Sequence, residues 1–330
     1  MKKVGIPHSL FYYYHYPLWK TFFADLGAKV VTSPATNRLI IDQGINLAVD
    51  ELCFPIKSYY GHVMELSYQP LDYIFIPRLV SIEHKGYICP KFMGLPDMIK
   101  ASIPNLPEVI DITIDLSKSD KTLNKDIIKL GQLFTHNKRL IKDALEHATN
   151  EFYLCRSLTK QGYTMAEAIK IWEGEEITYS QESEITIGVL GHGYSLYDEM
   201  LSMDIVNKLR NLKCRVVLPE YLEREKVENA AATIPKRVFW TLGRKMVGSA
   251  LHMEEIQEVD GIIYLACFGC GPDSLIGEII ERKIIDKPFM LLTIDEHTGE
   301  GGIMTRLEAF CDMLHRRRYK VDENNLSAHG

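Results

Sequence analysis

The chain has 330 residues, of which 46% are hydrophobic and 25% charged, and this composition is typical of a soluble globular protein with two domains. The formal net charge of −6 and the pI near 6.0 exclude the basic surface that binding to nucleic-acid phosphates requires, so we expect no nucleic-acid partner. No stretch approaches the roughly 20 consecutive apolar residues of a membrane span, and the first residues lack the apolar core of a signal peptide. We therefore expect a cytoplasmic protein with no membrane partner.

Short β-branched runs alternate with helix-like segments along the whole chain. They lie at 2–6, 28–33, 72–80 and 109–116, and again at 184–191, 213–220, 260–268 and 287–295. This alternation predicts an α/β fold with two flavodoxin-like or Rossmann-like parallel-sheet domains and a cleft between them. Between the two sets of runs lies a polar, helix-favouring stretch. We expect an N-terminal α/β domain over 1–119, a helical connector over 120–180 and a C-terminal α/β domain over 181–330.

Three of the seven cysteines share one local pattern. Cys53, Cys89 and Cys270 are each followed within two residues by a proline that opens a predicted helix. Proline is favoured at the first helical positions, so each thiol is expected at a helix N-terminus, where backbone N–H groups and the dipole favour a thiolate. Such positions lie at the carboxyl ends of parallel strands, where ligands bind. The pattern predicts that the cleft gathers these three thiols as metal ligands.

Other interpretations of the cysteines remain open. A single free cysteine is more often a buried core thiol than a ligand, and this is the interpretation that we favour for Cys155, Cys214 and Cys311. Three thiolates and one histidine would also complete a structural zinc site, although the close-spaced cysteine pairs of such sites are missing. The C-x-x-C pair formed with Cys270 makes Cys267 a further ligand candidate.

Polar residues after two predicted strands are candidates for acid–base chemistry. The glycine-flanked His192 follows the strand at 184–191, and its turn can bring backbone amides close to an anion, although a plain tight turn explains the glycines equally well. Glu296, His297 and Glu300 follow the last predicted strand and would donate or accept protons if their loop faces the cleft. A solvated helix N-terminus whose acids complement the dipole explains this loop equally well.

Six segments between Gly5 and Phe310 carry a family resemblance. They are GIPHSLFYYYHYPLWKTFFADLGAKVVTSPATNR, ELCFPIKSYYGHV, YICPKFMGLPD, GHGYSLYDE, FGCGPDS and TIDEHTGEGGIMTRLEAF, of which the last two are the most specific. Through them the chain resembles the 2-hydroxyacyl-CoA dehydratase and benzoyl-CoA reductase superfamily. It looks more closely like the activase-related branch of that superfamily, which is similar to a 2-hydroxyglutaryl-CoA dehydratase component.

The resemblance implies an iron–sulfur cluster, [4Fe-4S] in type, held by Cys53, Cys89 and Cys270 with one iron left without a protein thiolate. Cys267 lies outside the family pattern, and a double-cubane cluster is a further option if subunits share ligands. The resemblance also implies a separate ATP-hydrolysing activase that supplies electrons, an acyl-CoA or other small-molecule substrate, and a homodimer or a related second subunit. Lys57, one turn beyond Cys53, would offset the charge of the cluster, although a lysine at the surface is the commoner outcome.

Three functions follow from these observations. The first is an oxygen-sensitive iron–sulfur enzyme or enzyme component of anaerobic metabolism, which carries out low-potential electron transfer or reductive or dehydrating chemistry. The second is a non-catalytic electron carrier or cluster-delivery protein in which Cys267 supplies the fourth ligand. The third is a zinc-stabilised or metal-free binding module. Replacing Cys267 with alanine distinguishes the first two, and iron and sulfide analysis identifies the third.

Overall fold

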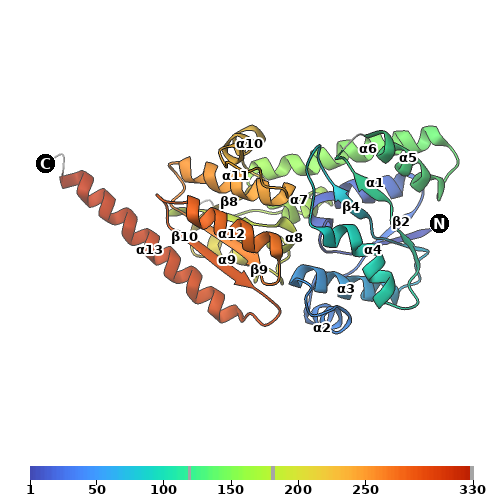
Figure 1. The fold of residues 1–330 in the computed structure, drawn as a ribbon, viewed down its shortest axis with the longest axis horizontal. Helices are drawn as coiled ribbons and strands as arrows, with labels where there is room; N and C mark the ends of the chain where they lie inside the picture. Colours follow the sequence, from blue (N-terminus) through green and yellow to red (C-terminus); the bar gives the residue numbers. More distant parts are fainter. Residues whose placement is uncertain (118–119, 180–182, 328–330) are drawn as a thin grey trace.

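A computed structural model describes residues 1–117, 120–179 and 183–327 of the chain. It contains two four-stranded parallel sheets, which confirms the expected α/β fold. Figure 1 shows the N-terminal half with the first sheet in blue and green, and the C-terminal half with the second sheet in yellow to red. The expected boundary at 180/181 lies outside the described residues. Among the helices described, none has the length and hydropathy needed to cross a membrane.

The first sheet has the strand order β2-β1-β3-β5, with all neighbours parallel. Its strands are β1 (Lys3–Ile6), β2 (Lys29–Thr32), β3 (Tyr73–Phe75) and β5 (Glu108–Ile110), and a separate parallel pair consists of β4 (Arg78–Ser81) and β6 (Thr113–Asp115). The runs at 72–80 and 109–116 therefore form two strands each rather than one. Pro77 lies between β3 and β4, and because proline has no N–H to donate, the ladder is interrupted there.

The helices of the N-terminal half and of the following stretch cover the first sheet. They are α1 (Tyr12–Asp25), α2 (Arg38–Leu47), α3 (Phe54–Ser67), α4 (Pro90–Ser102), α5 (Asp120–Gln132), α6 (Lys138–Ser157), the 3-10 helix η1 (Leu158–Gln161) and α7 (Met165–Trp172). Helices α6 and α7 pack against α1. Glu167 of α7 also accepts a hydrogen bond of 2.6 Å from Arg210 of the C-terminal half, so this helical stretch contacts both halves.

The second sheet has the order β10-β9-β7-β8 and is also parallel throughout. Its strands are β7 (Ile185–Gly191), β8 (Cys214–Val217), β9 (Gly261–Cys267) and β10 (Phe289–Ile294). Its helices are α8 (Gly193–Leu196), α9 (Ile205–Asn211), α10 (Arg224–Ala232), α11 (Thr241–Glu255), α12 (Gly271–Lys283) and α13 (Glu300–Ser327). Strand β9 is buried along its whole length, as expected for a central parallel strand with both faces covered.

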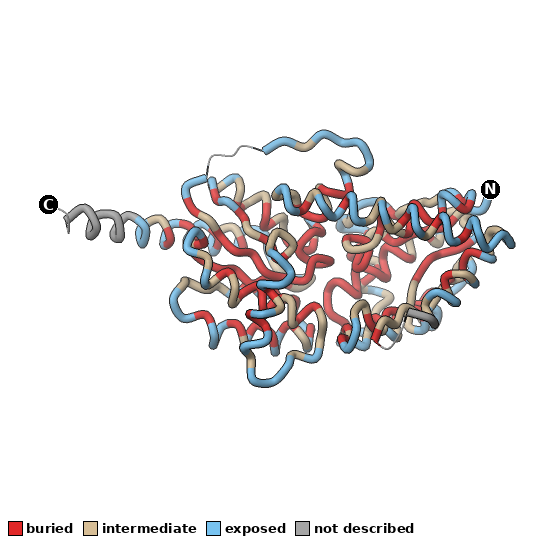
Figure 2. The backbone as a smooth tube through the Cα atoms, turned by 90° about the horizontal axis from the view of Figure 1, so that it is seen from above, coloured by how far each residue is buried: buried red, intermediate tan, exposed pale blue. Residues whose placement is uncertain are grey.

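Buried side chains connect the two halves. One apolar cluster runs from β1 and α1 through Phe92 and Tyr194 to β7 and β9, so the halves share a continuous core. Figure 2 shows this distribution, with buried residues passing through the middle of both halves and exposed residues on the outer surface. The carboxyl ends of the strands of each sheet therefore lie close to the contact between the halves, and the candidate site is found there.

Candidate metal centre

Cys53, Cys89 and Cys270 occupy equivalent positions in the fold. Each is the N-cap residue of a helix, namely α3, α4 and α12, and each of these helices has a proline in its first turn. None of the three makes a side-chain capping hydrogen bond. A backbone N–H of the first helical turn acts to lower the pKa of each sulfur, but burial outweighs it at Cys89, and the hydrogen bond with Cys53 together with burial outweighs it at Cys270. The placement expected from the prolines is therefore found in the structure, and we call this group the three-cysteine site.

Cys53 and Cys270 approach each other across the contact between the halves. A hydrogen bond from the thiol of Cys270 lowers the pKa of Cys53 to about 7, against the opposing effect of burial. The pKa of Cys270 is raised because it keeps the shared proton. Gly269 lies beside this contact, and its backbone adopts φ +73°, a conformation that favours glycine. The two thiols therefore titrate as a coupled pair across the contact between the halves.

Cys89 is the half-buried member of the three-cysteine site. Burial raises its pKa, and it interacts electrostatically with Cys53 and Lys91. It lines a small cavity of about 10 Å³ together with His192, Tyr194 and other residues. Such a volume holds about one water molecule, and neither Cys53 nor Cys270 lines it. Among the described residues, the ligand atoms that lie within 4.8 Å of one another are those of His192, Cys270 and Asp273, so the three thiols do not form so close a group.

His192 and Asp273 form a buried pair beside the thiols. His192 Nε2 lies 3.0 Å from Asp273 Oδ1, and the two residues are 3% and 2% exposed. Asp273 also accepts hydrogen bonds from the hydroxyl of Tyr264 at 2.8 Å and from the backbone N–H of Cys267 at 3.1 Å. Burial alone would raise the pKa of Asp273, but His192 and these donors outweigh it and the pKa is lowered.

The pairing of His192 with Asp273 uses Nε2 and leaves the second ring nitrogen, Nδ1, without a partner among the described residues. Burial would lower the pKa of His192, but Asp273 outweighs this effect and the pKa is raised. His192 Nδ1 is buried and has no hydrogen-bond partner among the described residues. One ligand atom each from His192, Cys270 and Asp273 lies within 4.8 Å of the others, so the group could hold a metal ion. Asp273 was not predicted from the sequence, although an acidic residue in the first turn after a ligand cysteine is a visible signal.

The other cysteines are arranged as core thiols. Cys267 is buried at the end of β9, and its thiol donates a hydrogen bond of 3.3 Å to the hydroxyl of Ser195. Burial raises its pKa far above the ordinary value. Cys155, Cys214 and Cys311 are buried as expected, the last two with their sulfur atoms 3.5 Å apart. This arrangement favours Cys267 as a packing residue, and its role as a ligand stays a prediction.

Three candidate acid–base residues follow β10, and one of them lies at the contact between the halves. Glu296 accepts a 2.5 Å hydrogen bond from Lys57 of α3, and their side chains are only 13% and 9% exposed. His297 is exposed, and Glu300 is exposed and pairs with Lys208 at 2.7 Å. Lysines usually lie at the surface, but Lys57 is buried and pairs with the half-buried carboxylate of Glu296 in the other half.

Removing the charge of Glu296 is expected to destabilise the protein measurably. Glu296→Gln leaves the buried ammonium of Lys57 without a counter-charge, which costs about 3 kcal/mol of unfolding free energy. Glu300→Gln in the same loop removes the charge of an exposed carboxylate and should change it by less than about 0.5 kcal/mol. Urea unfolding of both variants measures the difference. Equal effects of the two substitutions would contradict the assignment of a buried cross-half ion pair.

A second polar chain crosses between the halves at Asp198, in the GHGYSLYDE segment. Its carboxylate accepts hydrogen bonds from the hydroxyl of Thr36 and from the backbone N–H groups of Met200 and Leu201, the latter two at 3.1 Å. Thr36 in turn bonds His62 Nε2 at 2.9 Å. Burial raises the pKa of Asp198 to about 6, although these hydrogen bonds oppose the shift.

The raised pKa of Asp198 predicts a characteristic pH dependence. Folded Asp198 binds its proton more tightly than the unfolded chain does, so its contribution to stability falls as the pH rises from about 4 to about 6 and is constant above that range. A shift of this size corresponds to about 3 kcal/mol. Asp198→Asn keeps an acceptor oxygen but does not titrate, so the difference in unfolding free energy between the two proteins should change by this amount over that range. A constant difference would contradict the prediction.

Comparison with known protein families identifies the family of this chain. The model of the family described as CoA enzyme activase uncharacterised domain (DUF2229) matches residues 3–222, about two thirds of the chain. The chain belongs to this family. No curated protein matches it.

The family membership agrees with the activase-related branch that the sequence resembles, at the coarse level of a link to acyl-CoA dehydratase systems. The part matched by the CoA enzyme activase domain contains the first sheet, α1 to α9, β7 and β8. It includes Cys53, Cys89 and His192 but ends before Cys270 and Asp273. The third thiol and the carboxylate partner of His192 are therefore contributed by the segment that follows the matched domain.

Proposed function

We propose that this chain binds an iron–sulfur cluster through Cys53, Cys89 and Cys270 and serves as the electron-transferring component of an acyl-CoA dehydratase-type system. The observation that supports the proposal is the placement of three cysteines at three helix N-termini drawn from both halves, with Cys53 and Cys270 interacting and the pKa of Cys53 lowered to about 7. Membership of the CoA enzyme activase family supports the acyl-CoA context. The electrons would come from a separate ATP-hydrolysing activase, because the sequence contains no phosphate-binding loop of the G-x-x-x-x-G-K-[ST] type.

The donor set fits an iron–sulfur cluster chemically. Thiolates are the ligands of these clusters, and the helix N-termini together with Lys91 would offset their negative charge. When bound, the cluster supplies one-electron chemistry at low potential. The chain itself keeps water away through the buried surroundings of Cys53 and Cys270. Asp273 holds the ring of His192 through Nε2, in the way that carboxylates hold the far nitrogen of metal-binding histidines, and this orients Nδ1 as a lone-pair donor.

The packing adds a condition to this proposal. The cavity next to Cys89 measures about 10 Å³, and the Cys53 and Cys270 thiols are hydrogen-bonded to each other. Binding of a cluster would therefore require the start of α12 to move away from the start of α3. Gly269 and Gly271 flank Cys270, and no atoms lie within 4 Å of where a Cβ of Gly271 would be, so this segment has room to adjust.

A zinc-stabilised site is the second candidate, favoured by the His192, Cys270 and Asp273 group. Zinc accepts nitrogen, sulfur and carboxylate oxygen together, and a single ion needs less space than a cluster. The carrier model with Cys267 as fourth ligand is less favoured, because that thiol already bonds Ser195 inside the core.

Anaerobic purification followed by metal analysis tests the proposal. We expect about four iron and four sulfide per chain after reconstitution, with a broad visible absorption and an electron paramagnetic resonance signal after reduction with dithionite. One zinc per chain without sulfide would support the second candidate instead. A folded protein that takes up neither metal under these conditions would overturn both.

A further inference from the structure

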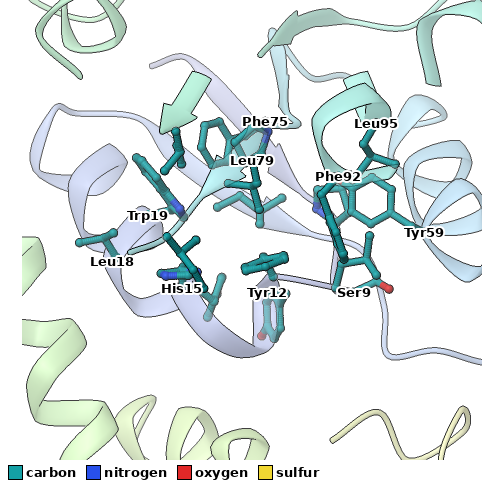
Figure 3. A pocket seen from close by; sticks show the side chains of 18 of the residues that line it. Ser9, Tyr12, His15, Leu18, Trp19, Tyr59, Phe75, Leu79, Phe92 and Leu95 are labelled. Carbon is teal, nitrogen blue, oxygen red and sulfur yellow. The ribbon is translucent and has the colours of Figure 1, made fainter. Parts of the chain in front are cut away.

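The N-terminal half contains an apolar cavity of about 180 Å³. It lies between α1, the end of the first sheet, α4, α5 and α6. Figure 3 shows the rings of Tyr12, Trp19, Phe75 and Phe92 arranged around it. Protein interiors are packed closely and rarely leave spaces much larger than a water molecule, so a cavity of this size in an otherwise dense core points to an occupant.

The chemistry of the cavity wall selects for an uncharged occupant. None of its lining residues carries a carboxylate, an ammonium or a guanidinium group. Burial lowers the pKa of His15 to about 4, and it raises the pKa values of Tyr12 and Tyr59, so these groups are neutral at pH 7. An anion such as a carboxylate or a phosphate would lose its hydration here without gaining a counter-charge.

One polar atom in the wall lacks a partner. Ser9 lines the cavity and is 1% exposed, and its hydroxyl has no hydrogen-bond partner among the described residues. Buried hydroxyl groups are normally satisfied, because leaving one unpaired is costly. Figure 3 shows buried Ser9 on the same side as Phe92 and Tyr59, and half-buried Leu18 on the opposite side.

We propose that this cavity is a binding site for a neutral organic molecule or group of about one six-membered ring, with a single hydrogen-bonding substituent that pairs with Ser9. An apolar cavity of about 150 Å³ can take up benzene, so the size matches one ring with a small substituent. The flat aromatic rings in the wall suit stacked or edge-on contact with such a ring.

The position of the cavity relates it to the three-cysteine site. Phe92 lines both this cavity and the small cavity that contains Cys89 and His192. Its ring packs edge-on against Phe11, with centroids 4.9 Å apart. A ligand in the apolar cavity would therefore be one side chain away from Cys89. The proposal does not rest on the iron–sulfur assignment, since every lining group is present in the metal-free chain.

Calorimetric titration of the full-length, metal-free chain with phenol, toluene and benzoate tests the proposal. Phenol and toluene should bind saturably, and benzoate should not. Ser9→Ala should weaken phenol binding about fivefold while leaving toluene binding unchanged, because only phenol can bond the hydroxyl. This variant should fold normally, since it removes an unsatisfied polar group.

A matched pair of tryptophan variants on α6 locates the binding site. Leu145→Trp fills the cavity and should weaken both neutral probes more than about tenfold. Leu154→Trp places the same residue at a position on this helix that is 58% exposed and should leave both affinities unchanged. Circular dichroism checks that both variants are folded. Binding of benzoate as tight as that of phenol, no saturable binding of either neutral probe, or equal effects of the two tryptophans would each overturn the proposal, whatever the metal content turns out to be.

Discussion

Single alanine substitutions of Cys53, Cys89 and Cys270 should each lower the iron and sulfide content of anaerobically reconstituted protein at least about tenfold. Loss of a group that only orients a metal ligand already costs 10- to 100-fold in affinity, so loss of a ligand itself should cost no less. Iron and sulfide analysis with electron paramagnetic resonance measures the result.

The remaining cysteines supply the controls. Cys155→Ala removes a buried thiol outside the three-cysteine site, so it should keep the cluster. Cys267→Ala removes only a hydrogen bond to Ser195 and should leave the cluster content and spectrum unchanged. Cluster loss in Cys267→Ala would favour the closed, four-cysteine carrier. Full retention of the cluster in any of the three ligand variants would show that the ligand set is wrong.

Asp273→Ala is expected to cause the largest loss of stability, about 3–5 kcal/mol in the free energy of unfolding of the metal-free protein. The substitution leaves three buried donors unpaired, which are His192 Nε2, the Tyr264 hydroxyl and the Cys267 amide. Asp273→Asn should cost less, because the amide oxygen can still accept part of these bonds. Urea unfolding measures both variants.

The pH dependence of this loss distinguishes a charged pair from simple packing. Because the pKa of Asp273 is lowered by folding, its carboxylate stabilises the folded protein above the unfolded-state pKa of about 3.9. This stabilisation is lost as the pH falls through the folded-state pKa. Because the pKa of His192 is raised by folding, its protonated ring stabilises the folded protein below the unfolded-state pKa of about 6.5. This stabilisation is lost as the pH rises through the folded-state pKa. The effect of Asp273→Ala should therefore be largest between about pH 4 and 6.5.

A control for Asp273 lies on the same helix. Glu278 pairs with Arg282 on the surface, with side chains 53% and 76% exposed. Glu278→Ala should change the unfolding free energy by less than about 0.5 kcal/mol. If Asp273→Ala were no more destabilising than this control, the buried network around His192 would not have the role described here.

The parts of the fold that depend on local rules were predictable from the sequence. The prolines after Cys53, Cys89 and Cys270 indicate where three helices begin, because proline is favoured in the first turn, and all three thiols are indeed N-cap residues. The division of the run at 72–80 was also visible in principle, since Pro77 cannot donate a ladder hydrogen bond. The prediction of one strand over this run was wrong because it ignored the interruption at Pro77.

The partners of buried charged groups could not be predicted in the same way. Lys57 meets Glu296, 239 residues later in the chain, and Asp198 meets Thr36 across 162 residues. These pairs depend on how the two halves dock, which hydrophobic periodicity does not encode. The same holds for His297 and Glu300, which share the loop of Glu296 but lie at the surface.

The division of the three-cysteine site between two halves has a consequence for regulation. Two sulfurs belong to one half and the third to the other, and the Lys57–Glu296 pair joins the same two bodies nearby. If the site holds the proposed cluster, a partner that contacts both halves would change the spacing of the three cysteines without contacting the cluster. Binding at the outer surface of the two halves would then act on a buried site.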